Sequence, residues 1–333
     1  MNYKGQDLRP GSPHTFTVDT SLVFQWLPKR YGYPIPEKYL ERLSEWAKRE
    51  NTRVVKLVIN GSGFTPEQRK ELENKISNRE FNLNKNIELI DFNELDLGEY
   101  EFSFHLQPNK KIELSKCPLY TVSQYFRDLY SIPESKRLSF GVEIDSMSIF
   151  MLLALKSPMI YFDFDILPKE DKKLSEIQAS QGFLVAENDR KGYDYDGIPN
   201  IENAIISVSD AGKVKIVEFY NEMKRRFQNH YPILQSSPHN IYTIMENIIY
   251  HTPLDKALST FMSGYKSFSE HFNKLLEEKR SLIQETFGFK TNGGEVDIQY
   301  DNSWTKNKDE LYTKEEIAKI DSVTRVVTSI QIK

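Results

Sequence analysis

Two aspartates, Asp163 and Asp165, are the residues of this sequence whose type and spacing best suit a chemical site. One residue separates them in 159–168, a short apolar run that predicts a buried strand reaching the edge of a sheet. Because strand side chains alternate between two faces, we expect both carboxylates on one face and the neighbouring phenylalanines on the other. Two carboxylates can hold Mn²⁺ or Mg²⁺, which keeps open positions for phosphate oxygens. The alternative is a pair of solvated acids at a strand end.

The segments that must position these acids alternate between strands and helices. Apolar runs predict strands at 22–26, 54–59 and 87–92, and amphipathic patterns predict helices at 36–49 and 66–76. Thr65 and Gln68 form a capping box at the start of the second helix. This alternation predicts an α/β fold with a mostly parallel central sheet flanked by helices, in which ligands bind beyond the carboxyl ends of the strands. Trp26, Asn60 and Asp163 stand at such ends.

The rest of the chain predicts additions to one domain. Further patterns indicate helices at 143–155 and 214–228 and strands at 182–186, 204–208 and 296–300. We predict a flexible N-terminal lead at 1–18, a catalytic domain at 19–304 and a C-terminal tail at 305–333. The catalytic domain carries a helical insertion at about 94–138 and an added helical hairpin at about 254–288.

Composition excludes several classes of function. The 333 residues have a formal net charge of −4, so no overall basic field favours nucleic acid as a partner. The single cysteine, Cys117, cannot form an internal disulfide, which fits a reducing compartment. We expect no transmembrane segment, because the most apolar region is interrupted by Lys156 and Pro158. The chain also lacks Gly-x-Gly-x-x-Gly, Walker and Gly-x-Ser-x-Gly motifs, and its six histidines show no zinc spacing.

A set of short motifs, weak one by one, keeps a distinctive order over residues 21–304. The motifs are Phe24-Gln25-Trp26, Tyr39-Leu40, Asn60-Gly61 running on to Gln68, Tyr161 to Asp165, Glu202-Asn203-Ala204-Ile205, and Asn302-Ser303 before Trp304. In this order the chain resembles the bacterial effector glycosyltransferases that put N-acetylglucosamine on arginine (the NleB/SseK group). It is more distantly similar to the large clostridial glucosylating toxins.

The resemblance implies a GT-A-like fold and a UDP-sugar donor used with Mn²⁺ or Mg²⁺. The residues that it implies for binding the nucleotide sugar are Gln25, Trp26, Tyr39, Asp145, Asp163 and Trp304. Those that it implies for the metal are Asp163, Asp165, Asp301, Asn302 and Ser303. Glu202 and Asn203 match the pair proposed to act on the acceptor, with Glu202 as general base.

Each of these roles has a structural alternative. Trp26 would stack on uracil, but it would equally suit a buried core position. Tyr39 would lie near the donor, although its helical spacing also fits core packing. Trp304 would close over the diphosphate, or follow an ordinary turn. Glu202 could instead cap a helix or strand.

Two departures from the family pattern bear on substrate choice. On the helix before the acids the family has Asp-x-x-Arg, whereas this chain has Asp145 and Ser148 and so lacks the cation. The arginine-modifying members have a histidine ahead of the Glu-Asn pair, and the stretch 182–187 contains none. The sugar, N-acetylglucosamine or glucose, and the acceptor residue therefore stay open.

We expect a metal-dependent glycosyltransferase that moves a sugar from a UDP-sugar to a host protein. The resemblance implies a monomeric bacterial virulence effector, secreted without a signal peptide into the host cytosol. The first alternative is a catalytically impaired homologue that only binds UDP-sugar or a partner. A nucleotidyltransferase ranks lower, because its Gly-Ser turn usually stands shortly before the acids, and Gly61-Ser62 lies about a hundred residues upstream.

Overall fold

The computed structural model describes the core of the chain and part of each end. The described residues are 14–16, 20–106, 116–168, 174, 177–179, 182–187, 201–228, 287–289, 296–298 and 306–331. Most of the predicted helical hairpin at 254–288 and all of residues 301–305 lie outside them. Among the described residues, no helix combines the length and the apolar character that crossing a membrane requires.

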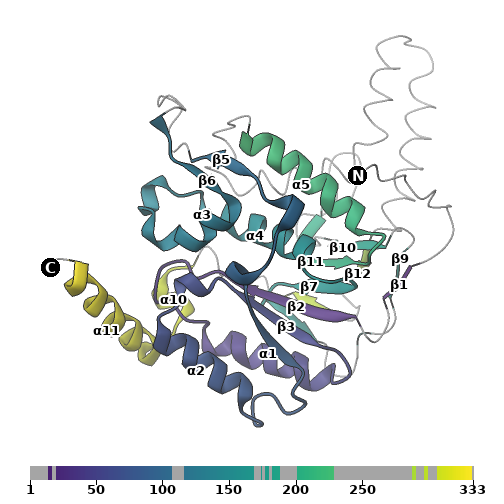
Figure 1. The fold of residues 1–333 in the computed structure, drawn as a ribbon. Coiled ribbons are helices and arrows are strands. Elements are labelled where there is room, and N and C mark those ends of the chain that lie inside the picture. The colour runs from purple at the N-terminus through teal and green to yellow at the C-terminus, as the bar shows by residue number, and fades with distance from the viewer. Residues whose placement is uncertain are drawn as a thin grey trace, which may run out of the picture.

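A seven-stranded sheet forms the centre of the molecule (Figure 1). Its order is β12 (Phe287–Phe289), β10 (Phe183–Glu187), β11 (Ile201–Val208), β7 (Met159–Phe162), β2 (Ser21–Trp26), β3 (Val55–Ile59) and β4 (Ile87–Asp91). The neighbours from β7 to β4 pair in parallel, whereas β11 runs antiparallel to both β7 and β10. The expected α/β fold with a mostly parallel sheet is confirmed.

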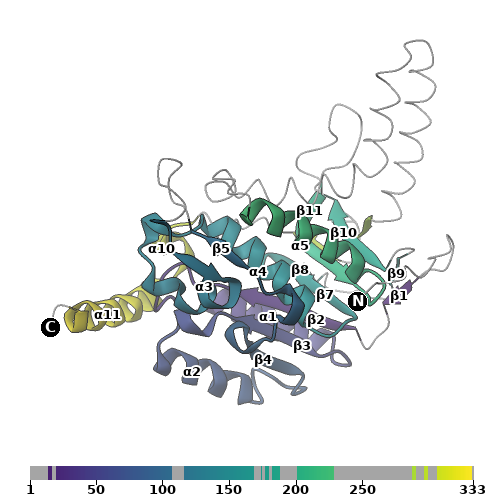
Figure 2. The same cartoon turned by 45° about the horizontal axis from the view of Figure 1, so that its top comes forward.

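Helices cover both faces of this sheet (Figures 1 and 2). On one face lie α1 (Glu37–Arg49) and α2 (Pro66–Ser77), and on the other α3 (Val122–Asp128), α4 (Phe140–Ala154) and α5 (Lys213–Gln228). Alternation along β2 feeds both layers: Phe24 packs in the cluster with α1, while Val23 packs in the cluster with α4. The sheet is therefore buried on both sides, as its apolar strands require.

Local sequence signals explain the helix that follows β3. The Thr65 Oγ1 atom accepts a hydrogen bond from the Gln68 N–H at 3.2 Å, and the Gln68 side chain accepts one from the Thr65 N–H at 3.0 Å. The predicted capping box is thus confirmed. The Gln68 amide also donates to the Gly32 carbonyl at 2.7 Å, so this box ties the start of α2 to the loop after β2.

The acidic segment differs from its predicted form. The expectation of one strand through 159–168 is wrong, because β7 ends at Phe162 and a turn separates it from β8 (Ile166–Pro168). The Ile166 N–H donates to the Asp163 carbonyl at 3.1 Å and closes this turn. Phe162, Phe164 and Ile166 still pack in one cluster, so the expected apolar face is confirmed.

Shorter elements complete the described structure. Three pairs of strands stand outside the main sheet: β1 (His14–Phe16) with β9 (Ile177–Ala179), β5 (Ser103–His105) with β6 (Leu119–Thr121), and β8 with β13 (Val296–Ile298). Short 3-10 helices are η1 (Gly61–Gly63), η2 (Phe92–Glu94), η3 (Gly98–Tyr100), η5 (Leu129–Ser131) and η6 (Glu134–Lys136). After α10 (Lys308–Leu311), α11 (Lys314–Gln331) begins next to α2 and points away from it (Figure 1).

Candidate active site

The carboxyl ends of the parallel strands bring the predicted residues to one edge of the sheet. Trp26 pairs with Ile59, at the ends of β2 and β3, and Asp163 directly follows β7. The Asp163 N–H donates to the Ala204 carbonyl at 2.8 Å. Because β11 is antiparallel to β7, the first residues of β11 reach this same edge. Glu202 belongs to these residues, so its backbone lies near this edge, while its side chain lies outside the description.

The Tyr161 hydroxyl contacts one of the predicted aspartates and is influenced by the charges of two others. This hydroxyl donates a short hydrogen bond to the Asp163 carboxylate, two residues further along the chain. Burial and the nearby charges of Asp163, Asp145 and Asp165 raise the pKa of Tyr161 well above its ordinary value. The hydroxyl thus stays protonated and keeps its role as a donor. Asp145 comes from α4, so the structure brings together three of the predicted acidic residues from two elements.

Two side chains of α1 hold the acidic turn, and sequence analysis missed both. The Arg42 Nη1 atom donates to the Phe164 carbonyl at 2.7 Å, between the two aspartates. The Trp46 Nε1 atom donates to the Ile166 carbonyl at 3.0 Å. Because Arg42 and Trp46 are four residues apart, they lie on the same side of the helix. The Arg42 guanidinium also lies 5.2 Å from the centre of the Tyr39 ring.

The aromatic residues predicted for the base pack against one another. The Trp26 and Tyr39 rings lie 5.7 Å apart, and both contact Phe164, with centroid distances of 6.0 and 5.5 Å. Trp26 is 8% exposed and Tyr39 is 0% exposed. Both side chains therefore pack in the core, which is the structural alternative to a binding role that the sequence left open for each. The Trp26 indole N–H is buried and has no hydrogen-bond partner among the described residues, so contact with a base stays a prediction for this side chain.

Gln25 links the central strand to the helix that carries Asp145. Its Nε2 atom donates to the Ile144 carbonyl at 3.1 Å, and its buried Oε1 atom has no hydrogen-bond partner in the described part of the chain. Ser148 donates to the Asp145 carbonyl at 2.8 Å. The side chain at position 148 thus bonds to the backbone of its own helix and supplies no cation to the site.

Asn60 stands at a strand end but has a structural role. Its amide donates to the Phe126 carbonyl at 2.9 Å, and its Oδ1 atom accepts from Ser62 Oγ at 2.7 Å and Asn93 Nδ2 at 2.8 Å. The side chain is fully buried. It joins η1, η2 and α3 at the edge of the sheet, and its hydrogen-bonding groups are used within the protein.

Only two of the five predicted metal ligands lie among the described residues. In that part of the chain, no group of three or more histidine, cysteine or acidic side chains could hold an ion. Asp163 and Asp165 offer carboxylate oxygens, which suit a hard divalent cation. The other predicted ligands, Asp301, Asn302 and Ser303, lie outside the description, as does Trp304. Two carboxylates fit an ion that keeps positions open for phosphate oxygens.

Comparison with known proteins shows the fold. No protein-family model and no curated protein match the chain. A solved structure described as a transferase has a TM-score of 0.52 at 17% identity, over 86% of this chain and 94% of that chain. A bacterial N-acetylglucosamine transferase, NleB, has a TM-score of 0.41 at 20% identity, over 71% and 89%. The catalytic domain of alpha-toxin from Clostridium novyi has a TM-score of 0.39 at 12% identity, over 84% and 70%. The expected GT-A-like class of fold is confirmed.

Proposed function

We propose that this protein is a glycosyltransferase that transfers a sugar from a UDP-sugar to a protein acceptor. One observation carries the proposal. At the carboxyl edge of a GT-A-like sheet, the Tyr161 hydroxyl donates to Asp163 and is acted on by the charges of Asp145 and Asp165. In an open α/β sheet, this edge is where ligands bind. A concentration of negative charge at a ligand-binding edge suits a cation that in turn binds a diphosphate.

Mn²⁺ or Mg²⁺ would be held by Asp163 and Asp165, with Asp301, Asn302 and Ser303 as further proposed ligands. When bound, such an ion neutralises negative charge on a departing nucleoside diphosphate. The chain's own part is to fix the carboxylates. Tyr161 orients Asp163 by its hydrogen bond, and the turn between the aspartates is held by Arg42 from α1.

The remaining roles complete the proposal. Trp26 and Gln25 would lie beside the uracil, with Tyr39 packed against Trp26 near the donor, and Trp304 would cover the diphosphate. Glu202, next to Asn203, would accept the proton of the acceptor nucleophile, and the antiparallel pairing of β11 with β7 supports their position. The donor sugar is N-acetylglucosamine or glucose. The acceptor is a host protein, and the enzyme is a secreted bacterial effector that acts as a monomer in the host cytosol.

A second candidate function is binding of UDP-sugar without transfer. The observation that favours it is the internal hydrogen bond of Ser148, because a side chain bonded to its own helix brings no charge to the sugar or diphosphate. Hydrolysis of the donor distinguishes the two functions, since only a protein competent in glycosyl transfer cleaves the sugar from UDP.

Calorimetry with UDP tests the proposal in the presence and absence of Mn²⁺. We expect Mn²⁺ to increase the affinity for UDP and Asp163→Asn to remove that increase. The asparagine still accepts a hydrogen bond from Tyr161, so the fold is kept. Because loss of a partner that merely orients a ligand costs about 10–100-fold in metal affinity, loss of the ligand itself should cost at least about tenfold.

Asp210→Asn is the matched control. Asp210 is exposed and follows β11, whose pairing with β7 places it at the opposite edge of the sheet. Equal losses in both variants, or no uptake of UDP by the intact protein with Mn²⁺ present, would exclude the proposed function. If UDP binds as expected, release of UDP from UDP-N-acetylglucosamine or UDP-glucose identifies the donor and excludes the binding-only alternative.

A further inference from the structure

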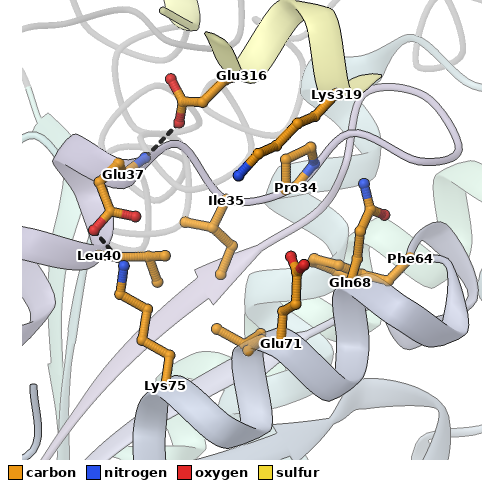
Figure 3. Close-up of a pocket in the computed structure, with 11 residues that line it drawn as sticks. Pro34, Ile35, Glu37, Leu40, Phe64, Gln68, Glu71, Lys75, Glu316 and Lys319 are labelled. Carbon is orange, nitrogen blue, oxygen red and sulfur yellow. Dashed lines mark hydrogen bonds and ion pairs between the residues drawn. The ribbon is translucent and has the colours of Figure 1, made fainter. Parts of the chain in front are cut away.

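A cavity lies away from the acidic turn, between α1, α2 and α11. Its volume is about 240 Å³, slightly below the roughly 300–1,000 Å³ of sites for drug-sized ligands. Its apolar lining consists of Pro34, Ile35, Leu40, Phe64 and Leu72. Figure 3 shows charged side chains from the three helices around Ile35 and Leu40. The cavity thus suits a group about the size of one side chain, with an apolar body and a polar end.

Hydrogen bonds between distant segments fix the walls of this cavity. The Tyr312 hydroxyl donates to the Pro34 carbonyl at 2.9 Å, and the Glu37 N–H donates to the Glu316 carboxylate at 2.8 Å. On the other side, the Gln68 amide donates to the Gly32 carbonyl. The C-terminal helix is therefore attached to the loop before α1, and that loop is attached to α2. A cavity held in this way is formed before a ligand arrives, which lowers the cost of binding.

The charged groups at the rim are unequal in number. Three carboxylates, from Glu37, Glu71 and Glu316, face two ammonium groups, from Lys75 and Lys319. Glu37 is paired with Lys75, and Glu316 accepts hydrogen bonds from two backbone N–H groups, of Glu37 and Thr313. The positive charge of Lys319 helps to lower the pKa of Glu316 and so favours its ionised form. Glu71 is exposed and has no ion pair among the described residues, so one negative charge is left over at the mouth.

We propose that this cavity binds an aliphatic cation, that is, an amine or guanidinium carried on a short hydrocarbon chain. The hydrocarbon chain would lie on Ile35, Leu40 and Phe64, and the charged end would meet the Glu71 carboxylate at the rim. This chemistry occurs in free small molecules and in lysine and arginine side chains of a polypeptide. The inference is independent of the proposed glycosyl transfer, because it concerns a different site and needs no nucleotide.

Saturation-transfer NMR with probes of one chain length tests the inference. We expect n-butylguanidinium and n-butylamine to bind the full-length protein more tightly than 1-butanol, and n-butyrate to bind weakest. A second arm compares acetyl-Gly-Arg-Gly-amide with acetyl-Gly-Gly-Gly-amide. Preference for the arginine peptide over n-butylguanidinium assigns the site to a polypeptide, and the opposite order assigns it to a small molecule.

Variants at the rim should change the affinity for n-butylguanidinium in opposite directions. Glu71→Gln should weaken binding roughly two- to fivefold, the range expected for an exposed ion pair, and Lys319→Gln should strengthen it by a similar factor. Both side chains are exposed, so neither change threatens the fold. Glu80→Gln, an exposed acid beyond the end of α2 that does not line the cavity, should have no effect. Equal binding of 1-butanol and n-butylguanidinium, or unchanged binding in Glu71→Gln, would overturn the inference.

Discussion

At the scale of single residues, Tyr161 determines how the acidic turn presents its charge. Its hydroxyl is the hydrogen-bond donor to Asp163, and its raised pKa keeps this donor protonated at every pH near neutrality. We predict that Tyr161→Phe weakens Mn²⁺-dependent binding of UDP by about tenfold or more, as loss of a partner behind a metal ligand does. Calorimetry measures the effect. Tyr120→Phe, in the β5–β6 pair, is the control, and a similar loss there would show that the Tyr161 effect is not local.

The residue scale also shows what sequence patterns could and could not predict about the site. Period-two alternation predicts Asp163 and Asp165 on one face, and the same rule applies to Tyr161, which stands two residues before Asp163 at the end of a strand. Arg42 could not be found in this way, because its bond to the Phe164 carbonyl spans 122 positions and has no local signature. The sequence places Asn60 at a strand end by a local pattern. Its buried hydrogen bond to the Phe126 carbonyl joins distant parts of the chain and has no such pattern.

At the scale of elements, the capping box of α2 connects helix stability to the cavity beside it. Thr65 supplies the oxygen that the Gln68 N–H needs. We predict that Thr65→Ala lowers the free energy of unfolding by about 1 kcal/mol, the usual cost of losing such a cap. Chemical denaturation of the variant and of Thr65→Ser measures this difference. The serine variant should stay close to the original protein, because it keeps the hydroxyl, and an equal loss in both variants would contradict the capping argument.

The elements that sequence analysis predicted best are those with signals inside the element. The box at Thr65 and Gln68 and the helical spacing along 36–49 are local, and both helices formed where expected. The acidic segment shows the limit of such reasoning. Apolar residues stand on both sides of each aspartate and favour one strand by their pattern. The turn at Asp163 arises because Phe164 packs against Trp26 and Tyr39 from other elements while β8 pairs with β13. A contact that ends a strand in this way is invisible in the strand's own sequence.

At the scale of the whole molecule, the segment around α10 and α11 is attached to the loop before α1 and to the start of α1. Glu316 in α11 accepts hydrogen bonds from the N–H groups of Glu37, at the start of α1, and of Thr313. Tyr312 packs edge-on against Tyr33, with ring centroids 5.8 Å apart. Through these contacts the C-terminal helix closes one side of the cavity. Its attachment therefore depends on a carboxylate that must stay ionised to accept both bonds well.

This dependence gives a prediction for pH. Partial burial opposes ionisation of Glu316, but the hydrogen bonds from Thr313 and Glu37 outweigh it, so the pKa of Glu316 lies below its ordinary value. A carboxyl group whose pKa is depressed by folding stabilises the folded state above its unfolded pKa, and this contribution disappears as the pH falls through the folded pKa. We predict that α11 loses protection against hydrogen exchange, measured relative to the intrinsic exchange rate at each pH, as the solution is acidified below about pH 4.3, the ordinary glutamate pKa. For the variants, faster exchange likewise means exchange relative to that intrinsic rate. Glu316→Gln should show the faster exchange already at neutral pH and lose this acid dependence. Glu315→Gln, an exposed neighbour in the first turn of the same helix, should behave like the original protein, and faster exchange there would show that the helix responds to its total charge and not to this carboxylate.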